Sequence, residues 1–238
     1  MMITSPMALT SKSNRGMLAP SLAILLLAGA GVIGGCASAG IAMRETMGIP
    51  KREQLVDRVG DARDAQTEAK EQFASALEEF MAVTGAQGGD LEAKYKSLNR
   101  EFERSKDRAD DVRSRITSVE TVAEKLFSEW RVEMEQYSSA SLRSKAERQY
   151  DATRREYDSL IQKMKAASAK MDPVLTAFND QVLYLKHNLN ARAIASLQDT
   201  ASEIQSDVAR LVQEMEASIS EANAFIDSMQ GPEEAAAG

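Results

Sequence analysis

The stretch from Leu91 to Tyr137, LEAKYKSLNREFERSKDRADDVRSRITSVETVAEKLFSEWRVEMEQY, decides the fold of this chain. Mostly apolar side chains recur in it with the strict 4-3 spacing of helices that pack side by side, as in coiled coils. The residues between them are mostly charged or polar, which suits the solvated faces of a helix. The stretch therefore predicts one helix of 47 residues, about 70 Å long at 1.5 Å per residue. The series is Leu91, Tyr95, Leu98, Phe102, Ser105, Ala109, Val112, Ile116, Val119, Ala123, Leu126, Trp130, Glu133 and Tyr137.

Three further series show the same spacing, and no stretch alternates with a period of two for long enough to suggest a strand. We therefore predict an all-α fold, an elongated antiparallel coiled-coil bundle of three to four long helices over residues 50–230. The first series is Leu55, Val59, Ala62, Gln66, Ala69, Phe73, Ala76 and Phe80. The third is Tyr157, Ile161, Met164, Ser168, Met171, Leu175, Phe178, Val182, Leu185 and Leu189. The fourth is Ile204, Val208, Leu211, Met215, Ser218, Ala222, Phe225 and Met229.

Short segments with turn-forming residues separate these series. Pro50 suits the first turn of a helix, where its missing N–H costs nothing. Residues 84–90 hold three glycines and then a capping aspartate, so the first two helices should form an antiparallel hairpin. Residues 138–141 are a weaker break. Gly231-Pro232 should end the last helix, and residues 231–238 should form a disordered tail.

The number of helices depends on two places. A helix could begin at Asp172-Pro173, but the apolar phase runs through it unbroken, which favours a kink within one helix. At Lys186–Asn190 the third series loses its register. Either the chain reverses there and closes a four-helix bundle, or one long helix changes the partner on which it packs. Because no Gly or Pro occurs in residues 174–230, we expect the continuous helix.

The one cysteine, Cys36, ends a segment typical of bacterial export. Lys12 and Arg15 precede an uncharged apolar run over residues 22–33, which is followed by Gly34-Gly35-Cys36. A basic start, a short apolar core and small residues at a cleavage point are the three parts of a secretory signal peptide. The sequence Ile-Gly-Gly-Cys also resembles the lipobox of bacterial lipoproteins, in which the cysteine is lipidated and becomes the first mature residue.

We therefore predict a lipoprotein signal peptide over residues 1–35, lipid attachment at Cys36, and a lipidated N-terminus and tether over residues 36–49. An ordinary cleaved signal is one alternative. An uncleaved membrane span is another, although a span needs about 20 apolar residues and this core is shorter and broken by glycines. Ala37 stands where lipoproteins retained in the inner membrane have aspartate, so the resemblance implies an anchor in the outer membrane that faces the periplasm.

The composition excludes several classes of function. The chain has 29 basic and 36 acidic residues, and residues 1–35 hold two of the basic ones and no acidic one, so the mature charge is 27 − 36 = −9. Because an acidic chain without a basic block is a poor partner for nucleic acid, we expect no nucleic-acid binding. With Cys36 lipidated, no cysteine is left for a disulfide or a thiolate metal site.

Residues 180–192, DQVLYLKHNLNAR, are the densest mixture of polar groups in the chain and include its one histidine. They could form a contact for a partner or a ligand. Alternatively, His187 and Asn190 could be buried polar residues that set helix register. A lone histidine lacks the ligand set for zinc or a di-iron centre, so we predict no metal site. The candidate contact residues are Lys186, His187, Asn188, Asn190 and Arg192.

Motifs of catalysis are absent from the sequence. There is no phosphate-binding G-x-x-x-x-G-K-[ST] loop, no G-x-S-x-G nucleophile elbow and no H-E-x-x-H. The adjacent carboxylates at Glu78-Glu79 and Asp110-Asp111 fall on charged helix faces, and nothing marks them as an acid–base pair. Trp130 lies on an apolar series, so core packing is its default role and an exposed docking patch is the alternative. We predict no catalytic residue and no cofactor.

The chain resembles a family of uncharacterised bacterial helical lipoproteins, a domain of unknown function. The resemblance spans most of residues 50–229 and implies a secreted, helical, lipid-anchored protein without supplying an activity or a substrate. Its matching stretches are KREQLVDRV at 51–59, GGDL at 88–91, LFSEW at 126–130, MDPVL at 171–175 and KHNLNARA at 186–193.

These observations favour a non-enzymatic, lipid-anchored scaffold, spacer or adaptor on the periplasmic side of the cell envelope. Its partners would be the membrane, through the lipid at Cys36, and another protein or a second copy, through the helices. The alternative is a small-ligand or metal-binding envelope stress protein that uses the polar segment around His187.

Overall fold

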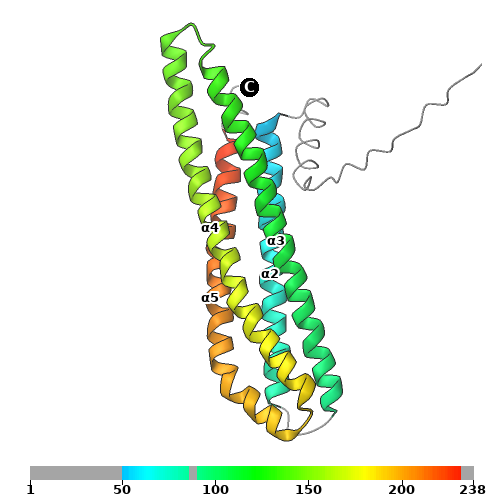
Figure 1. Cartoon of the computed structure of the whole chain (residues 1–238). Coiled ribbons are helices and arrows are strands. Elements are labelled where there is room, and N and C mark those ends of the chain that lie inside the picture. Colours follow the sequence, from blue (N-terminus) through cyan, green and yellow to red (C-terminus); the bar gives the residue numbers. More distant parts are fainter. Residues whose placement is uncertain (1–49, 86–89, 232–238) are drawn as a thin grey trace, which may run out of the picture. The chain divides into compact units, whose positions relative to one another are not determined.

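The computed structural model describes residues 50–85 and 90–231, and the predicted signal peptide, tether and tail lie outside these ranges, apart from Gly231. The described residues form four long helices: α2 (Lys51–Thr84), α3 (Leu91–Met134), α4 (Ala140–His187) and α5 (Ala191–Gln230). Consecutive helices contact each other and α5 also contacts α2, which closes a four-helix antiparallel bundle (Figure 1). No strand occurs among the described residues. The prediction of an all-α helical bundle is confirmed.

The helices begin and end where local chemistry satisfies their free backbone groups. The Asp90 carboxylate accepts a hydrogen bond of 3.0 Å from the Ala93 amide at the start of α3. The Ser139 hydroxyl accepts one of 3.4 Å from the Leu142 amide at the start of α4. At the end of α5 the Gly231 amide donates to the Asp227 carbonyl at 3.0 Å. The predicted breaks at residues 84–90, 138–141 and 231 therefore coincide with helix boundaries, although α3 ends at Met134 rather than at the predicted Tyr137.

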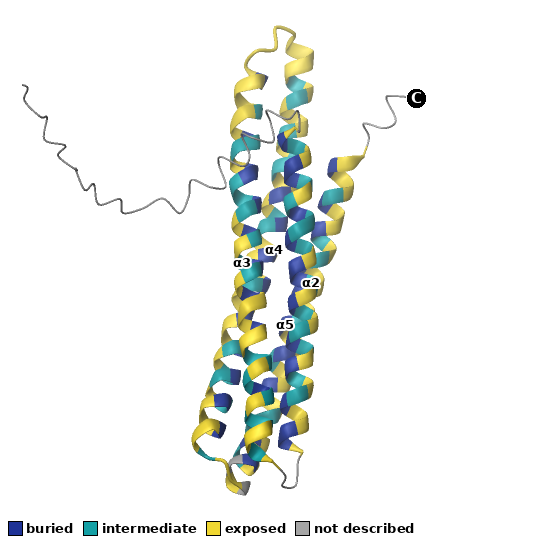
Figure 2. Ribbon diagram, turned by 90° about the vertical axis from the view of Figure 1, so that its right-hand side faces the viewer, coloured by how far each residue is buried: buried dark blue, intermediate teal, exposed yellow. Residues whose placement is uncertain are grey.

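The buried core follows two of the predicted series completely. All eight residues of the first series and all eight of the fourth are buried, including two polar ones, Gln66 and Ser218. Since α2 and α5 are neighbours, these two series face one another across the bundle. Figure 2 shows buried residues recurring along the helices between half-buried and exposed ones.

The other two series are only partly correct. In α4 the third series expected Ile161, Ser168 and Leu175 in the core, but they are half-buried. The buried residues at those turns are Leu160, Ala167 and Val174. In α3, likewise, Phe127 is buried and Leu126 half-buried, while Glu133 and Tyr137 at the end of the second series are exposed. Each helix packs on two neighbours, so its apolar face is wider than a single 4-3 seam.

The expected continuous helix through residues 186–190 is wrong, because the chain reverses there. The helix α4 ends at His187 and α5 begins at Ala191. The Asn188 amide donates to the Leu185 carbonyl at 3.2 Å, and its side chain donates to the Tyr184 carbonyl at 3.0 Å. Asparagine can end a helix without Gly or Pro because its side chain competes for the backbone groups.

The burial of the fourth series supplies the driving force for this reversal. A helix continuing past residue 187 would leave these side chains exposed on a single chain, whereas the reversal covers them with α2 and α4. Leu189, which the third series placed in the core, is exposed in the turn instead. Pro173, by contrast, lies within α4, so the prediction of one helix through Asp172-Pro173 is confirmed.

Candidate functional site

The candidate contact residues gather at the end of the bundle where α4 turns into α5. We call residues 180–192 the α4–α5 corner. Three apolar side chains are exposed on it, Leu183, Tyr184 and Leu189, with 38–45% of their surface accessible. The apolar side chains on the core face of α4 are buried, whereas these three are accessible to a partner.

The predicted polar residues lie beside these apolar ones. Lys186, His187, Asn190 and Arg192 are exposed, and Asn188 is half-buried. Because His187 and Asn190 are exposed, the interpretation that they are buried residues setting helix register is wrong. Lys186 and His187 occupy the last turn of α4, where positive charge interacts favourably with the helix dipole. The corner is thus a basic spot with apolar neighbours on an acidic chain.

The corner is held firmly against the rest of the bundle on its α5 side. Ile194 and Leu197 in the first turns of α5 are buried. The Gln198 side chain donates a hydrogen bond of 2.7 Å to the carbonyl of Thr84, the last residue of α2. These contacts place the corner beside the end of α2, and therefore at the end of the bundle opposite Pro50.

A buried polar pair that joins α2 to α5 shows where helix register is set by polar groups. The Ser218 hydroxyl donates a hydrogen bond of 2.9 Å to the Gln66 side-chain carbonyl, and both residues are completely buried. The signal for it was present in the sequence, since both residues interrupt otherwise apolar series. A polar residue on a packed seam is a known device for specifying register.

Four aromatic residues gather on α3 and α4 near the other end of the bundle. The Phe127 ring packs against Tyr150 and Tyr157 with centroids 5.6 and 5.4 Å apart, and the Arg154 guanidinium lies 4.9 Å from the Phe127 centroid. Trp130 is half-buried and meets Tyr150 edge-on at 5.6 Å, so it serves packing as expected.

The environment of this cluster perturbs one titratable group. Burial, followed by the nearby charge of Glu120, raises the pKa of Tyr157 to about 12. The same phenol lies at an open groove lined also by Phe127 and Arg131. A phenol that stays neutral throughout the physiological range is suited to packing and hydrogen bonding.

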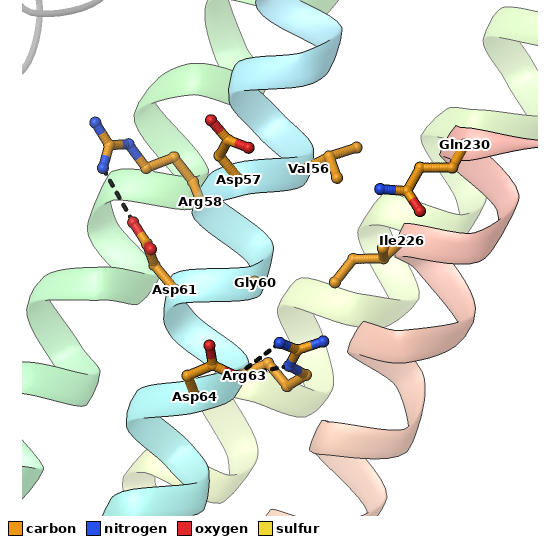
Figure 3. A pocket seen from close by; sticks show the side chains of 9 residues that line it. All are labelled: Val56, Asp57, Arg58, Gly60, Asp61, Arg63, Asp64, Ile226 and Gln230. Atoms are coloured by element: carbon orange, nitrogen blue, oxygen red, sulfur yellow. Dashed lines mark hydrogen bonds and ion pairs between the residues drawn. The ribbon is translucent and has the colours of Figure 1, made fainter.

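A second open groove runs between α2 and α5, and Figure 3 shows the side chains that line it. Its arginines are paired within or beside the groove: Arg58 with Asp61 at 3.1 Å, and Arg63 with Asp64 at 2.7 Å. Arg63 also donates to the Asn223 side chain at 3.1 Å. Because these guanidinium groups already bind carboxylates of α2, the groove is not suited to binding an anion.

Two further findings bear on the predicted site and anchor. Within residues 50–85 and 90–231, no cluster of three or more His, Cys, Asp or Glu side chains is placed to hold a metal ion. No helix in the same ranges has an apolar stretch sufficient to cross a bilayer. Cys36, the predicted lipid attachment residue, lies outside the described residues.

Comparisons with known proteins give one match. A family model described as "Protein of unknown function (DUF2959)" matches residues 41–229. These residues include all of α2, α3 and α4 and all but the last residue of α5. Neither the search of curated proteins nor the search of solved structures found a significant match.

Proposed function

We propose that this chain, which belongs to the family described as Protein of unknown function (DUF2959), is a lipid-anchored scaffold of the bacterial cell envelope. In this proposal Cys36 carries the lipid, and the anchor lies in the outer membrane facing the periplasm. The helical body acts without catalysis, as a spacer that presents the α4–α5 corner to a partner protein.

The observation that carries the proposal is the position of the corner relative to the chain's entry into the bundle. The chain enters α2 after Pro50, and the corner lies beside Thr84 at the other end of this helix. The helix has 34 residues, which corresponds to about 50 Å at 1.5 Å per residue. A body of this length anchored through residues 36–49 presents the corner well away from the membrane surface.

The chemistry of the corner suggests what it would bind. Exposed apolar side chains beside Lys186, His187 and Arg192 suit a partner surface that combines apolar residues with carboxylates. The partner would be a protein of the cell envelope. A second copy of this chain is the other occupant that an experiment has to separate from it.

The anchor is tested by mass spectrometry of the native protein with membrane fractionation. We expect a lipidated N-terminal Cys36 in the outer-membrane fraction, and an uncleaved or mislocalised Cys36→Ser variant. An unprocessed protein that starts at Met1 or Met2 in the soluble fraction would contradict the anchor.

The corner is tested by photocrosslinking in cells. A photoreactive residue at Leu183 or Leu189 should give a discrete adduct, and one at the exposed α5 residue Gln205 should not. Tyr184→Asp should abolish the adduct at Leu183, because it places an unpaired charge in the contact. An adduct of twice the mass of the chain would identify self-association instead. Equal labelling at Leu183 and Gln205 would contradict a contact at the corner.

A further inference from the structure

The end of the bundle opposite the α4–α5 corner is not flat, because the α3–α4 hairpin projects beyond it (Figures 1 and 2). Lys51 at the start of α2 forms an ion pair of 2.5 Å with Glu129. Arg52 donates a hydrogen bond of 2.6 Å to the carbonyl of Met229 at the end of α5. The ends of α2 and α5 are therefore level with Glu129. The helix α3 continues for five residues to Met134, about 8 Å further.

This projecting part exposes large apolar side chains. We call residues 131–149 the hairpin tip. Val132, Leu142 and Tyr137 on it have 58%, 52% and 41% of their surface accessible. Two helices alone can cover only the stripe between them, so side chains that project past the ends of α2 and α5, such as Val132 and Leu142, stay exposed. Tyr137 borders a groove beside Lys51 and Arg52 and is only partly covered there. Val132 and Leu142 belong to none of the predicted apolar series, so the sequence pattern gives no packing role to them.

The turn of the hairpin tip is held in a defined shape. The Arg143 guanidinium donates to the carbonyl of Glu135 at 3.2 Å and to that of Tyr137 at 2.9 Å. Ser139 caps α4 in the same turn. The exposed apolar groups are thus presented by an ordered turn, which reduces the entropy lost when they bind a surface.

The charge of the hairpin tip differs from that of the rest of the mature chain. The tip contains four basic residues, Arg131, Arg143, Lys145 and Arg148, and three acidic ones, Glu133, Glu135 and Glu147. Its net charge is +1, and the remainder of a mature chain of −9 therefore carries −10. Exposed apolar groups interspersed with arginine and lysine suit the interface of a bilayer with anionic headgroups.

The place where the chain enters the bundle decides which surface the tip meets. Pro50 lies at an open groove that is also lined by Trp130 and Tyr137, so the entry and the tip are at the same end. The 14 residues of 36–49 can span at most about 50 Å when fully extended. A lipid on Cys36 would therefore keep the bilayer within reach of the tip, and tethering makes even weak contacts effective.

We propose that the hairpin tip rests on the bilayer that holds the lipid of Cys36, with Val132, Tyr137 and Leu142 in the headgroup region. This inference rests on the proposed lipid anchor. It adds an orientation to the proposed anchor: the long axis of the bundle points away from the membrane surface, and the α4–α5 corner lies at its far end. The apolar groups and cations of the tip thus form a second, non-covalent membrane contact.

The test uses the lipidated full-length protein in vesicles of phosphatidylethanolamine and phosphatidylglycerol at a ratio of about 3:1, a composition that provides anionic headgroups. Cys36 is blocked by its lipid, so a single new cysteine can carry an environment-sensitive fluorophore. Leu142→Cys places it on the tip, and Leu183→Cys places it on the corner as a control of similar exposure. Nitroxide-labelled lipids then quench whichever fluorophore touches the bilayer.

We expect blue-shifted emission and at least twofold quenching at position 142, and emission as in water at position 183. The double variant Val132→Asp and Tyr137→Asp should halve the quenching at position 142 and leave the protein on the vesicles. Emission as in water at position 142 on protein that floats with the vesicles overturns the inference and leaves the anchor intact. Energy transfer between two labelled copies at position 142 without lipid quenching also overturns it, since the tip would then be a dimer contact. Failure of the wild-type protein to acquire a lipid or to float with the vesicles refutes the proposed anchor itself.

Discussion

Ser218 on α5 and Gln66 on α2 form a completely buried hydrogen bond of 2.9 Å. The two residues are 152 positions apart in the chain. The Gln66 side-chain nitrogen has no hydrogen-bond partner among the described residues. A half-satisfied amide in a core costs stability, and it restricts the helices to the one register in which its carbonyl meets Ser218.

Replacing this pair with apolar residues should stabilise the bundle. We expect Gln66→Leu combined with Ser218→Ala to raise the free energy of unfolding by about 1–3 kcal/mol, because it removes the buried amide that lacks a partner. Urea denaturation followed by circular dichroism measures this change. Ser218→Ala alone should instead destabilise the protein by about 1 kcal/mol, since it leaves the Gln66 carbonyl unpaired. A double variant that is less stable than wild type would contradict this expectation and indicate that the Gln66 side-chain nitrogen has a hydrogen-bond partner in solution.

The reversal at residues 188–190 predicts which helices can be crosslinked within one chain. Arg63 on α2 and Asn223 on α5 are joined by a hydrogen bond of 3.1 Å. In a Cys36→Ser background, Arg63→Cys with Asn223→Cys should give an intramolecular product with a short bis-maleimide, identified by mass spectrometry.

A matched control for this crosslink pairs Arg63→Cys with a cysteine at Lys170, an exposed residue of α4. The helices α2 and α4 lie diagonally across the bundle and meet through core side chains such as Phe80 and Phe178, not through their backbones. Because Arg63 and Lys170 lie outside this core, the pair should give little product. If the 63–223 pair crosslinks only between two chains, α4 and α5 are continuous in solution and the bundle forms from more than one copy.

Tyr157 makes the protein sensitive to alkaline pH. Its pKa is about 12 in the folded protein and about 10 in an unfolded chain. Above pH 10 the unfolded chain loses the phenolic proton while the folded protein keeps it, so stability falls as the pH rises from 10 to 12. Tyr157→Phe should retain about 1 kcal/mol more of its stability than wild type between pH 8 and pH 11. Urea titrations of both proteins at each pH measure the difference, and identical losses would show that this phenol titrates normally.

Gly60 offers a position where α2 can be improved. It lies inside the helix, and a methyl group on its α-carbon would meet nothing within 4 Å. We expect Gly60→Ala to raise the free energy of unfolding by about 0.8–1 kcal/mol, the difference in helix propensity. The change is measured by thermal melting. It also tests the groove of Figure 3, which Gly60 lines. A loss of stability would contradict the expectation that the added methyl group is accommodated without a clash.

The helices and most of their ends could be predicted from the sequence. The 4-3 spacing, Asp90 as a cap and the glycines before it act over a few residues, so they are legible without knowing the fold. The first and fourth series were also predicted correctly, since all of their residues are buried in the core on α2 and α5. The exposed apolar surface of the hairpin tip could not be predicted from the sequence. Val132 and Leu142 belong to no 4-3 series, and their exposure depends on where α2 and α5 end.

By itself, then, the sequence determined four amphipathic stretches, most of their boundaries and a cysteine placed as in lipoproteins. Only the tertiary structure decided that the chain reverses at Asn188, that Leu160 rather than Ile161 is buried, and that His187 is exposed. The physical reason is that helix periodicity is set between neighbours three and four residues apart. The reversal and the choice of core face are set by burial between helices distant in the chain, such as α2 and α5.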